Sequence, residues 1–120
     1  MALFHILGEA EWERAKAAGT YAPASLASEG FIHLSTARQL LRTAARFFAG
    51  RHDLVVLSID EARTCAPVRF EPADGDSFPH LYGPLEVDAV TEVAPLPLVG
   101  GRFTVPDAWK NIEKDFVSTG

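Results

Sequence analysis

GFIHLST, residues 30–36, predicts a short strand that runs without a linker into the start of a helix. Successive side chains of a strand point to opposite faces. Ile32 and Leu34 therefore share an apolar face, and the opposite face carries Phe31, His33 and Ser35. A histidine at the centre of such a strand is a candidate functional residue, although the same position also suits a histidine of the core or its rim.

The helix expected after this strand begins at Thr36. Thr36 and Gln39 have the spacing of a capping box, in which two side chains bond the backbone N–H groups of the first turn. The remaining N–H groups of that turn would open beside the face that carries His33. Because a helix N-terminus attracts anions, we expect Ser35 and Thr36 to help hold a phosphate or carboxylate there.

Composition excludes several classes of protein. The chain has 120 residues, of which 48% are hydrophobic and 22% charged, so residues 1–120 suit a single soluble domain. The net charge of −5 argues against nonspecific binding to nucleic acid or to acidic membranes, since both need a basic surface. A single cysteine, Cys65, fits a reducing compartment, and no apolar run approaches the roughly 18 residues of a membrane span. We therefore expect a cytoplasmic protein.

Helical and extended segments alternate along the chain, and the fold class follows from that order. Helices are expected at 9–18 and 37–49, each closed by a glycine, and strands at 3–7, 54–59, 68–71 and 85–93. The run 54–59 is almost entirely apolar, as is typical of a strand covered on both faces. The remaining segments are a connection at 23–29, in which Pro23 could begin one helical turn, a polar turn at 73–77 and a weakly amphipathic end at 106–116. We predict a compact α+β domain with two main helices and small antiparallel or mixed sheets.

A second candidate segment is FPHLYGPL, residues 78–85. If extended, it places His80 and Tyr82 on one face, where a ring nitrogen and a hydroxyl could orient a ligand. A turn whose aromatic residues cover the core is an equally good interpretation. Glu71, which shares a strand face with Arg69, is a candidate general base or ribose-binding carboxylate, and a surface ion pair is its alternative role.

No metal site is expected. None of the four histidines has the HxxxH or HExxH spacing that places two ligands on one helical face. Arg38, Arg42 and Arg46 recur at intervals of four, which is typical of a solvated helix face and also of a stripe that steers a phosphorylated ligand.

The chain also resembles a bacterial family catalogued as domain of unknown function 952. The resemblance covers about residues 3–93 in the same order and spacing, and residues 95–120 form a C-terminal extension for which we predict no role. The matching segments are Phe4-His5-Ile6, Gly19, Tyr21, Pro23, EGFIHLST at 29–36, VRFE at 68–71 and FPHLYGPL at 78–85. Phe70 stands where the family tends to have tryptophan.

The resemblance implies an ADP-ribosyltransferase-like fold, in which a split pair of small sheets encloses a cleft for NAD. Phe4-His5-Ile6 is similar to the first motif of those transferases, whose histidine binds the adenosine ribose of NAD. His33 and Ser35 lie in a segment similar to the second motif, where many transferases have tyrosine. Glu71 is the nearest match, by order, to the glutamate of the third motif.

Two hypotheses follow. In the first, the chain is an ADP-ribosyltransferase-like enzyme or a related phosphotransferase with NAD as co-substrate. Glu71 and His33 would then act in catalysis, and the nucleotide would contact His5, His33, Ser35, Thr36, His80 and Tyr82. In the second, the chain is a non-catalytic module that binds a nucleotide or a small anionic ligand. The sequence leaves the acceptor and the oligomeric state open.

Overall fold

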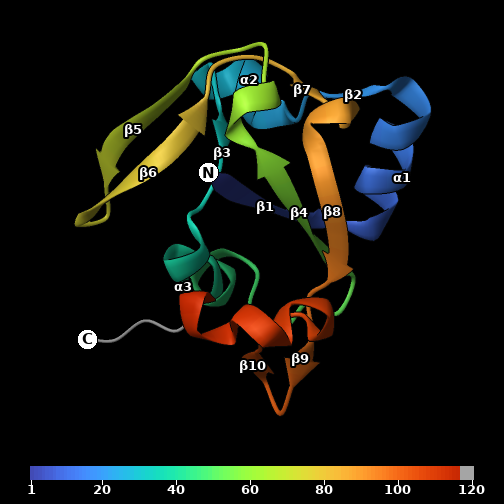
Figure 1. Cartoon of the computed structure of the whole chain (residues 1–120), viewed down its shortest axis with the longest axis vertical. Coiled ribbons are helices and arrows are strands. Elements are labelled where there is room, and N and C mark those ends of the chain that lie inside the picture. The colour runs from blue at the N-terminus through green and yellow to red at the C-terminus, as the bar shows by residue number, and fades with distance from the viewer. Residues whose placement is uncertain (117–120) are drawn as a thin grey trace.

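The computed structural model describes residues 1–116, in which short strands and helices alternate (Figure 1). The strands are β1 (Ala2–Gly8), β2 (Thr20–Tyr21), β3 (Ile32–His33), β4 (Leu54–Asp60), β5 (Val68–Ala73), β6 (Asp76–Leu81), β7 (Leu85–Glu86), β8 (Val90–Pro95), β9 (Leu98–Val99) and β10 (Arg102–Phe103). The α-helices are α1 (Glu9–Ala18), α2 (Ala24–Glu29) and α3 (Ala37–Phe47), and the 3-10 helices are η1 (Glu61–Arg63), η2 (Val87–Ala89) and η3 (Asp107–Phe116).

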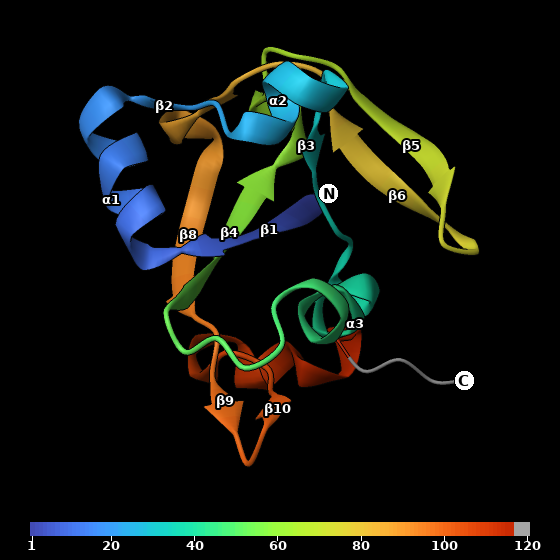
Figure 2. The ribbon, with the colours of Figure 1, turned by 180° about the vertical axis from the view of Figure 1, so that it is seen from behind.

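A three-stranded antiparallel sheet with the order β1-β4-β8 forms the centre of the molecule. All six residues from Leu54 to Ile59 are buried, so the prediction of a strand covered on both faces is confirmed. One face of the sheet packs on α3 and η3, and the other packs on α1 and the small sheets (Figures 1 and 2). Leu3, His5 and Leu7 alternate with Phe4 and Ile6 along β1, which places His5 on the second of these faces.

A second antiparallel sheet has the order β3-β6-β5. It meets the edge of the central sheet where Phe4 and Ser35 exchange backbone hydrogen bonds of 2.8 Å in both directions. The β5–β6 hairpin extends away from this junction above α3 (Figure 1). The structure is therefore an α+β fold with small antiparallel sheets that join at one edge.

Both predicted helices are present, and the conformation of the residues at their ends accounts for their lengths. α1 ends at Gly19, which has the left-handed φ of +82° that favours glycine. α3 begins after Thr36 with the expected capping box. It ends at Phe47 rather than at residue 49, because Phe48 leaves the helical conformation while its N–H bonds the carbonyl of Ala44.

The connection at 23–29 contains the helix α2, which begins after Pro23 as expected and is longer than the single turn predicted there. Other segments differ from the prediction. The strand expected at 68–71 continues to Ala73, so that the turn expected at 73–77 shrinks to two residues with positive φ, Asp74 and Gly75. Such a pair is typical of a type I′ hairpin turn, which keeps the flanking residues in register.

The segment 85–93, expected as one strand, divides into β7, η2 and β8. Its alternation of apolar residues changes phase where η2 buries Ala89. The weakly amphipathic end forms η3, which buries Trp109 and Phe116 against Phe4. No helix within residues 1–116 has the length and apolar character needed to cross a membrane.

Candidate functional site

Three of the four histidines gather where the edge of the central sheet meets the second sheet. His5 comes from β1, His33 from β3 and His80 from β6. We name this group and the side chains that contact it the imidazole cluster. Its members are His5, Tyr21, Glu29, Phe31, His33, Arg69, Glu71, His80 and Tyr82. Five of the residues predicted from the sequence, His5, His33, Glu71, His80 and Tyr82, thus lie together.

His33 and His80 lie directly opposite each other in the antiparallel pairing of β3 and β6. Paired residues of an antiparallel ladder project to the same face, and the two ring centroids are 5.5 Å apart. Phe31 packs against both rings: it stacks on His80 at 4.0 Å and meets His33 edge-on at 4.9 Å. The predicted face of Phe31 and His33 therefore continues onto the neighbouring strand.

His5 has both ring nitrogens occupied. Nδ1 lies 2.6 Å from the carbonyl oxygen of His33, and because a carbonyl only accepts, Nδ1 carries the proton. Nε2 is then the acceptor for the hydroxyl of Tyr21, 3.1 Å away. Burial lowers the pKa of His5 to about 4, so the ring is neutral at pH 7. His5 therefore braces β3 against β1 rather than presenting a free nitrogen.

His33 is held from one side by a carboxylate. Its Nε2 lies 2.8 Å from Oε2 of Glu29, the last residue of α2. Gly30 follows with a φ of +89°, a conformation that lets the chain reverse so that Glu29 faces a residue four positions later. Nδ1 of His33 has no hydrogen-bond partner within residues 1–116, and the side chain is 55% exposed.

His80 is also held by a carboxylate, but it is almost completely buried. Its Nδ1 lies 2.8 Å from Oε1 of Glu71, and the hydroxyl of Tyr82 donates to the same oxygen. The Tyr82 hydrogen bond, followed by that of His80, lowers the pKa of Glu71, while the same contact raises the pKa of Tyr82. Glu71 is thus a carboxylate at neutral pH.

The expected pairing of Arg69 with Glu71 takes a different form. The two residues share a face of β5, as predicted, but the guanidinium of Arg69 lies over the ring of Tyr82 at 5.2 Å. Within the part of the chain that the structure describes, no carboxylate lies at ion-pair distance from Arg69. Arg69 therefore adds an exposed positive charge opposite His80 in the sheet.

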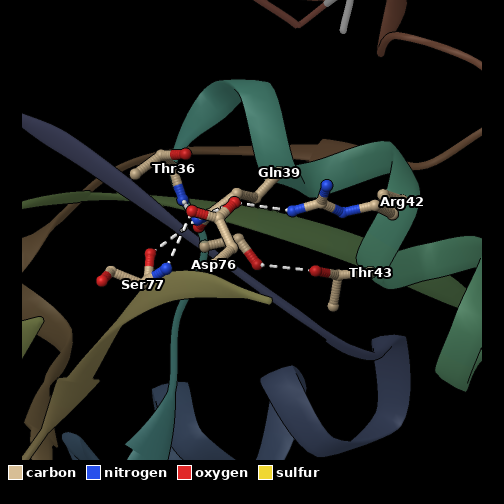
Figure 3. A network of polar contacts seen from close by, with 7 residues as sticks. Thr36, Gln39, Arg42, Thr43, Asp76 and Ser77 are labelled. Carbon is tan, nitrogen blue, oxygen red and sulfur yellow. Dashed lines mark hydrogen bonds and ion pairs between the residues drawn. The ribbon is translucent and has the colours of Figure 1, made fainter. Parts of the chain in front are cut away.

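Ser35 and Thr36, the other two predicted residues, make their polar contacts outside the imidazole cluster, and Figure 3 shows those of Thr36. Ser35 is buried and its hydroxyl donates to Thr43 over 3.2 Å. The backbone N–H of Thr36 donates to Oε1 of Gln39, whose amide nitrogen donates in turn to Asp76. The first turn of α3 therefore lies next to a carboxylate of the protein itself rather than next to the imidazole cluster.

Asp76 in this network stays ionised over almost the whole pH range. The hydrogen bond from Gln39, helped by the N–H of Ser77 and the guanidinium of Arg42, lowers its pKa to about 2. Arg46 pairs with Asp74 at the turn of the hairpin. Two of the three arginines along α3 thus clamp the β5–β6 hairpin, a role that their spacing alone did not indicate.

Four members of the cluster were not predicted as site residues: Tyr21, Glu29, Phe31 and Arg69. Sequence signals were available for two of them. Phe31 shares the strand face of His33, and Arg69 shares that of Glu71. Tyr21 and Glu29 reach the cluster only through the two-residue strand β2 and the turn at Gly30, neither of which has a detectable period.

The imidazole cluster lies beside a surface cavity. A cavity of about 360 Å³ between α1 and β2 is bordered by Tyr21, whose hydroxyl bonds His5. A smaller cavity of about 80 Å³ lies between α3 and the hairpin, where Phe78 borders it. Among residues 1–116, no three His, Cys, Asp or Glu side chains are arranged to hold a metal ion.

Comparison with known proteins gives a family and a set of solved structures. The family described as protein of unknown function (DUF952) matches residues 6–93. The crystal structure of protein CC0527 from Caulobacter crescentus is 37% identical, with a TM-score of 0.80, over 93% of this chain and 98% of that one. A crystal structure of its double mutant gives the same values. Its solution NMR structure has a TM-score of 0.75 at 37% identity, over 92% of this chain and 95% of that one. No curated protein sequence matches the chain.

Proposed function

This chain belongs to the DUF952 family, and we propose that its imidazole cluster binds NAD or a related ADP-ribose nucleotide and that it is an ADP-ribosyltransferase-like enzyme. The proposal depends on one observation above all. Glu71, which stands closest to the catalytic glutamate of such transferases in chain order, lies beside His80 and Tyr82 and on the same sheet as His33.

The charge of Glu71 suits the chemistry. Breaking the bond between nicotinamide and ribose leaves positive charge on the ribose, and a fixed carboxylate stabilises that charge. The hydroxyl of Tyr82 and the ring of His80 keep the pKa of Glu71 low, so the carboxylate is ionised at neutral pH. Both of its hydrogen bonds go to Oε1, which leaves Oε2 for the substrate.

The neighbouring side chains supply surfaces for the rest of a dinucleotide. Phe31 and Tyr82 are partly exposed aromatic rings on which a base can stack, and Arg69 is a cation for the phosphates. We place the phosphates near Arg69 rather than at Thr36, because the carboxylate of Asp76 lies at the first turn of α3. His33 has a free Nδ1 to bond a ribose hydroxyl, and His5 supports it from behind.

The arrangement of sheets also favours this proposal. Transferases of this type have two small sheets that part around the nucleotide. Here the sheets β1-β4-β8 and β3-β6-β5 are joined through Phe4 and Ser35, and the cluster lies at that junction. We therefore propose an ADP-ribosyltransferase-like fold for the chain.

Two measurements test the proposal. NAD should raise the melting temperature of the wild type and should raise that of His33→Ala far less, because the variant lacks the exposed imidazole of the site. His52→Ala is the matched control, since His52 is an exposed histidine outside the cluster. A wild type that NAD does not stabilise, or equal stabilisation of the wild type and His33→Ala, contradicts the proposed binding site.

The second measurement is release of nicotinamide from NAD. Glu71→Gln should abolish it while binding persists, and Glu113→Gln, which changes an exposed glutamate of η3, should leave it unchanged. Binding without release in the wild type would favour the alternative function, a non-catalytic module that holds a nucleotide in the same site.

A further inference from the structure

His33 and His80 share an arrangement that the proposed NAD binding does not require. Each imidazole has one nitrogen fixed by a carboxylate: Nε2 of His33 by Glu29 and Nδ1 of His80 by Glu71, both at 2.8 Å. A carboxylate on one ring nitrogen fixes the orientation of the ring and stabilises its protonated form. The second nitrogen of each ring is then the one that exchanges a proton.

Those second nitrogens are both accessible. Nδ1 of His33 belongs to a side chain that is more than half exposed. Every fully buried side-chain nitrogen or oxygen in residues 1–116 has a hydrogen-bond partner. Nε2 of His80 has none there, so this atom contacts solvent although only 7% of the side chain is exposed.

The two rings are also close enough to serve one small group. They project from directly opposed positions of β3 and β6, with ring centroids 5.5 Å apart and an angle of 76° between their planes. In the proposed arrangement a single phosphate bridges the two rings. Arg69, which lies over Tyr82 beside His80, supplies a positive charge for the phosphate oxygens.

We propose that His33 and His80 form an acid–base pair that hydrolyses a cyclic phosphodiester of ribose, in which one phosphate bridges two neighbouring hydroxyl oxygens. A paired base and acid suit this reaction because one proton must be removed from water while another is delivered to the departing oxygen. His33 is the base, since water reaches its exposed ring, and His80, whose Nδ1 is fixed by Glu71, is the acid.

The reaction balances without a cofactor. The oxygen of water forms a bond to phosphorus as the bond from phosphorus to one ribose oxygen breaks. Nδ1 of His33 takes a proton from the water, and Nε2 of His80 gives a proton to the ribose oxygen. The product is a ribose phosphomonoester with a free neighbouring hydroxyl. This activity goes beyond the proposed function and needs no NAD, so either can fail without the other.

The rate should pass through a maximum with pH, because one imidazole must be neutral while the other carries a proton. The titratable and charged groups that face the pair are Glu29 from α2, His5 from β1, Glu71 and Arg69 from β5, and Tyr82, which follows β6.

The test uses 2′,3′-cyclic AMP and follows the phosphomonoester product by phosphorus NMR. The wild type should turn over with a single pH maximum, and His33→Gln and His80→Gln should each lower kcat by about 100-fold or more. His52→Gln, prepared in parallel, should keep the wild-type rate, and a loss confined to the other two variants excludes a contaminating nuclease. His33 is exposed, so its variant tests the pair even if His80→Gln does not fold.

Three outcomes would overturn the inference: no hydrolysis by the folded wild type at millimolar substrate, hydrolysis that continues unchanged in His33→Gln, or a rate that shows no maximum with pH. Failure of NAD binding would leave the hydrolysis intact, whereas failure of hydrolysis with nicotinamide release preserved would leave the proposed function intact.

Discussion

The side-chain amide of Gln39 donates a hydrogen bond of 3.1 Å to the carboxylate of Asp76, which lies 37 residues later in the chain. The same amide also donates to the carbonyl of Ser77 over 2.7 Å, and its oxygen accepts from the N–H of Thr36. One buried side chain thus caps α3 and fastens the β5–β6 hairpin to it (Figure 3).

Gln39→Ala should therefore destabilise the fold by about 2 kcal/mol, because it leaves buried polar groups without partners. Urea unfolding followed by circular dichroism measures this difference. Arg38→Ala, one position earlier on the exposed side of α3, is the control and should change stability by less than about 0.5 kcal/mol. Equal effects of the two substitutions would show that the Gln39 network contributes nothing to stability.

Tyr82→Phe should raise the pKa of Glu71 toward its ordinary value of 4.5. The hydroxyl of Tyr82 is the largest cause of the lowered pKa, since a donor bonded to a carboxylate favours its charged form. Carboxyl carbon chemical shifts measured against pH give this value directly. The second cause, the hydrogen bond from His80, remains in the variant, so the rise should be incomplete. An unchanged pKa in Tyr82→Phe would contradict the hydrogen bond.

Gly83→Ala should be destabilising by about 1–3 kcal/mol, because overpacking forces neighbouring atoms apart. A Cβ at residue 83 would lie 2.6 Å from the Cβ of Ala66. Thermal unfolding measures the loss. Removing the opposing methyl group in the double variant Ala66→Gly/Gly83→Ala should recover most of it, after correction for Ala66→Gly alone. An additive double variant would show that the two positions do not touch.

The free energy of unfolding should decrease as the pH falls from about 6.5 to about 4, because His5 is buried as a neutral ring. Its pKa is about 4 in the folded chain and close to 6.5 when exposed, so the folded state binds fewer protons than the unfolded state between these values. The contribution of His5 is fully present above pH 6.5 and is lost as the pH falls toward 4. At 1.36 kcal/mol per pKa unit it amounts to about 3 kcal/mol.

The check compares wild type with His5→Gln in urea at pH 7 and at pH 4.5. The wild type should lose more stability between the two than the variant does, because the other titrating groups are common to both. The same loss in both proteins would mean that the ring of His5 is not buried as a neutral group.

The sequence predicted the elements that have a long period or a clear end. The apolar run of β4 and the capping box of α3 are examples, because each is determined by neighbouring residues. The two-residue strand β2 was not predicted, and β7 was expected only as the start of a longer strand at 85–93. Two residues show no alternation, and the pairing of β2 with β7 depends on contacts that are distant in the chain.

The candidate site was predictable in its residue types but not in its contacts. His33, His80 and Tyr82 were predicted because their imidazole rings and hydroxyl occupy alternate positions in short segments that were expected to be extended. That His33 faces Glu29 while His80 faces Glu71 depends on the turn at Gly30 and on the register of β5 with β6. The prediction of a phosphate site at Thr36 could not take account of Asp76, which only the hairpin brings there.

The length of the two-residue turn at Asp74 and Gly75 has a consequence for how this domain can vary. A shift of β5 by one residue against β6, which β3 anchors on its other side, would invert the faces of β5. Phe70 or Pro72 would then replace Glu71 next to His80. The register that this turn sets therefore determines whether His80 keeps its carboxylate partner.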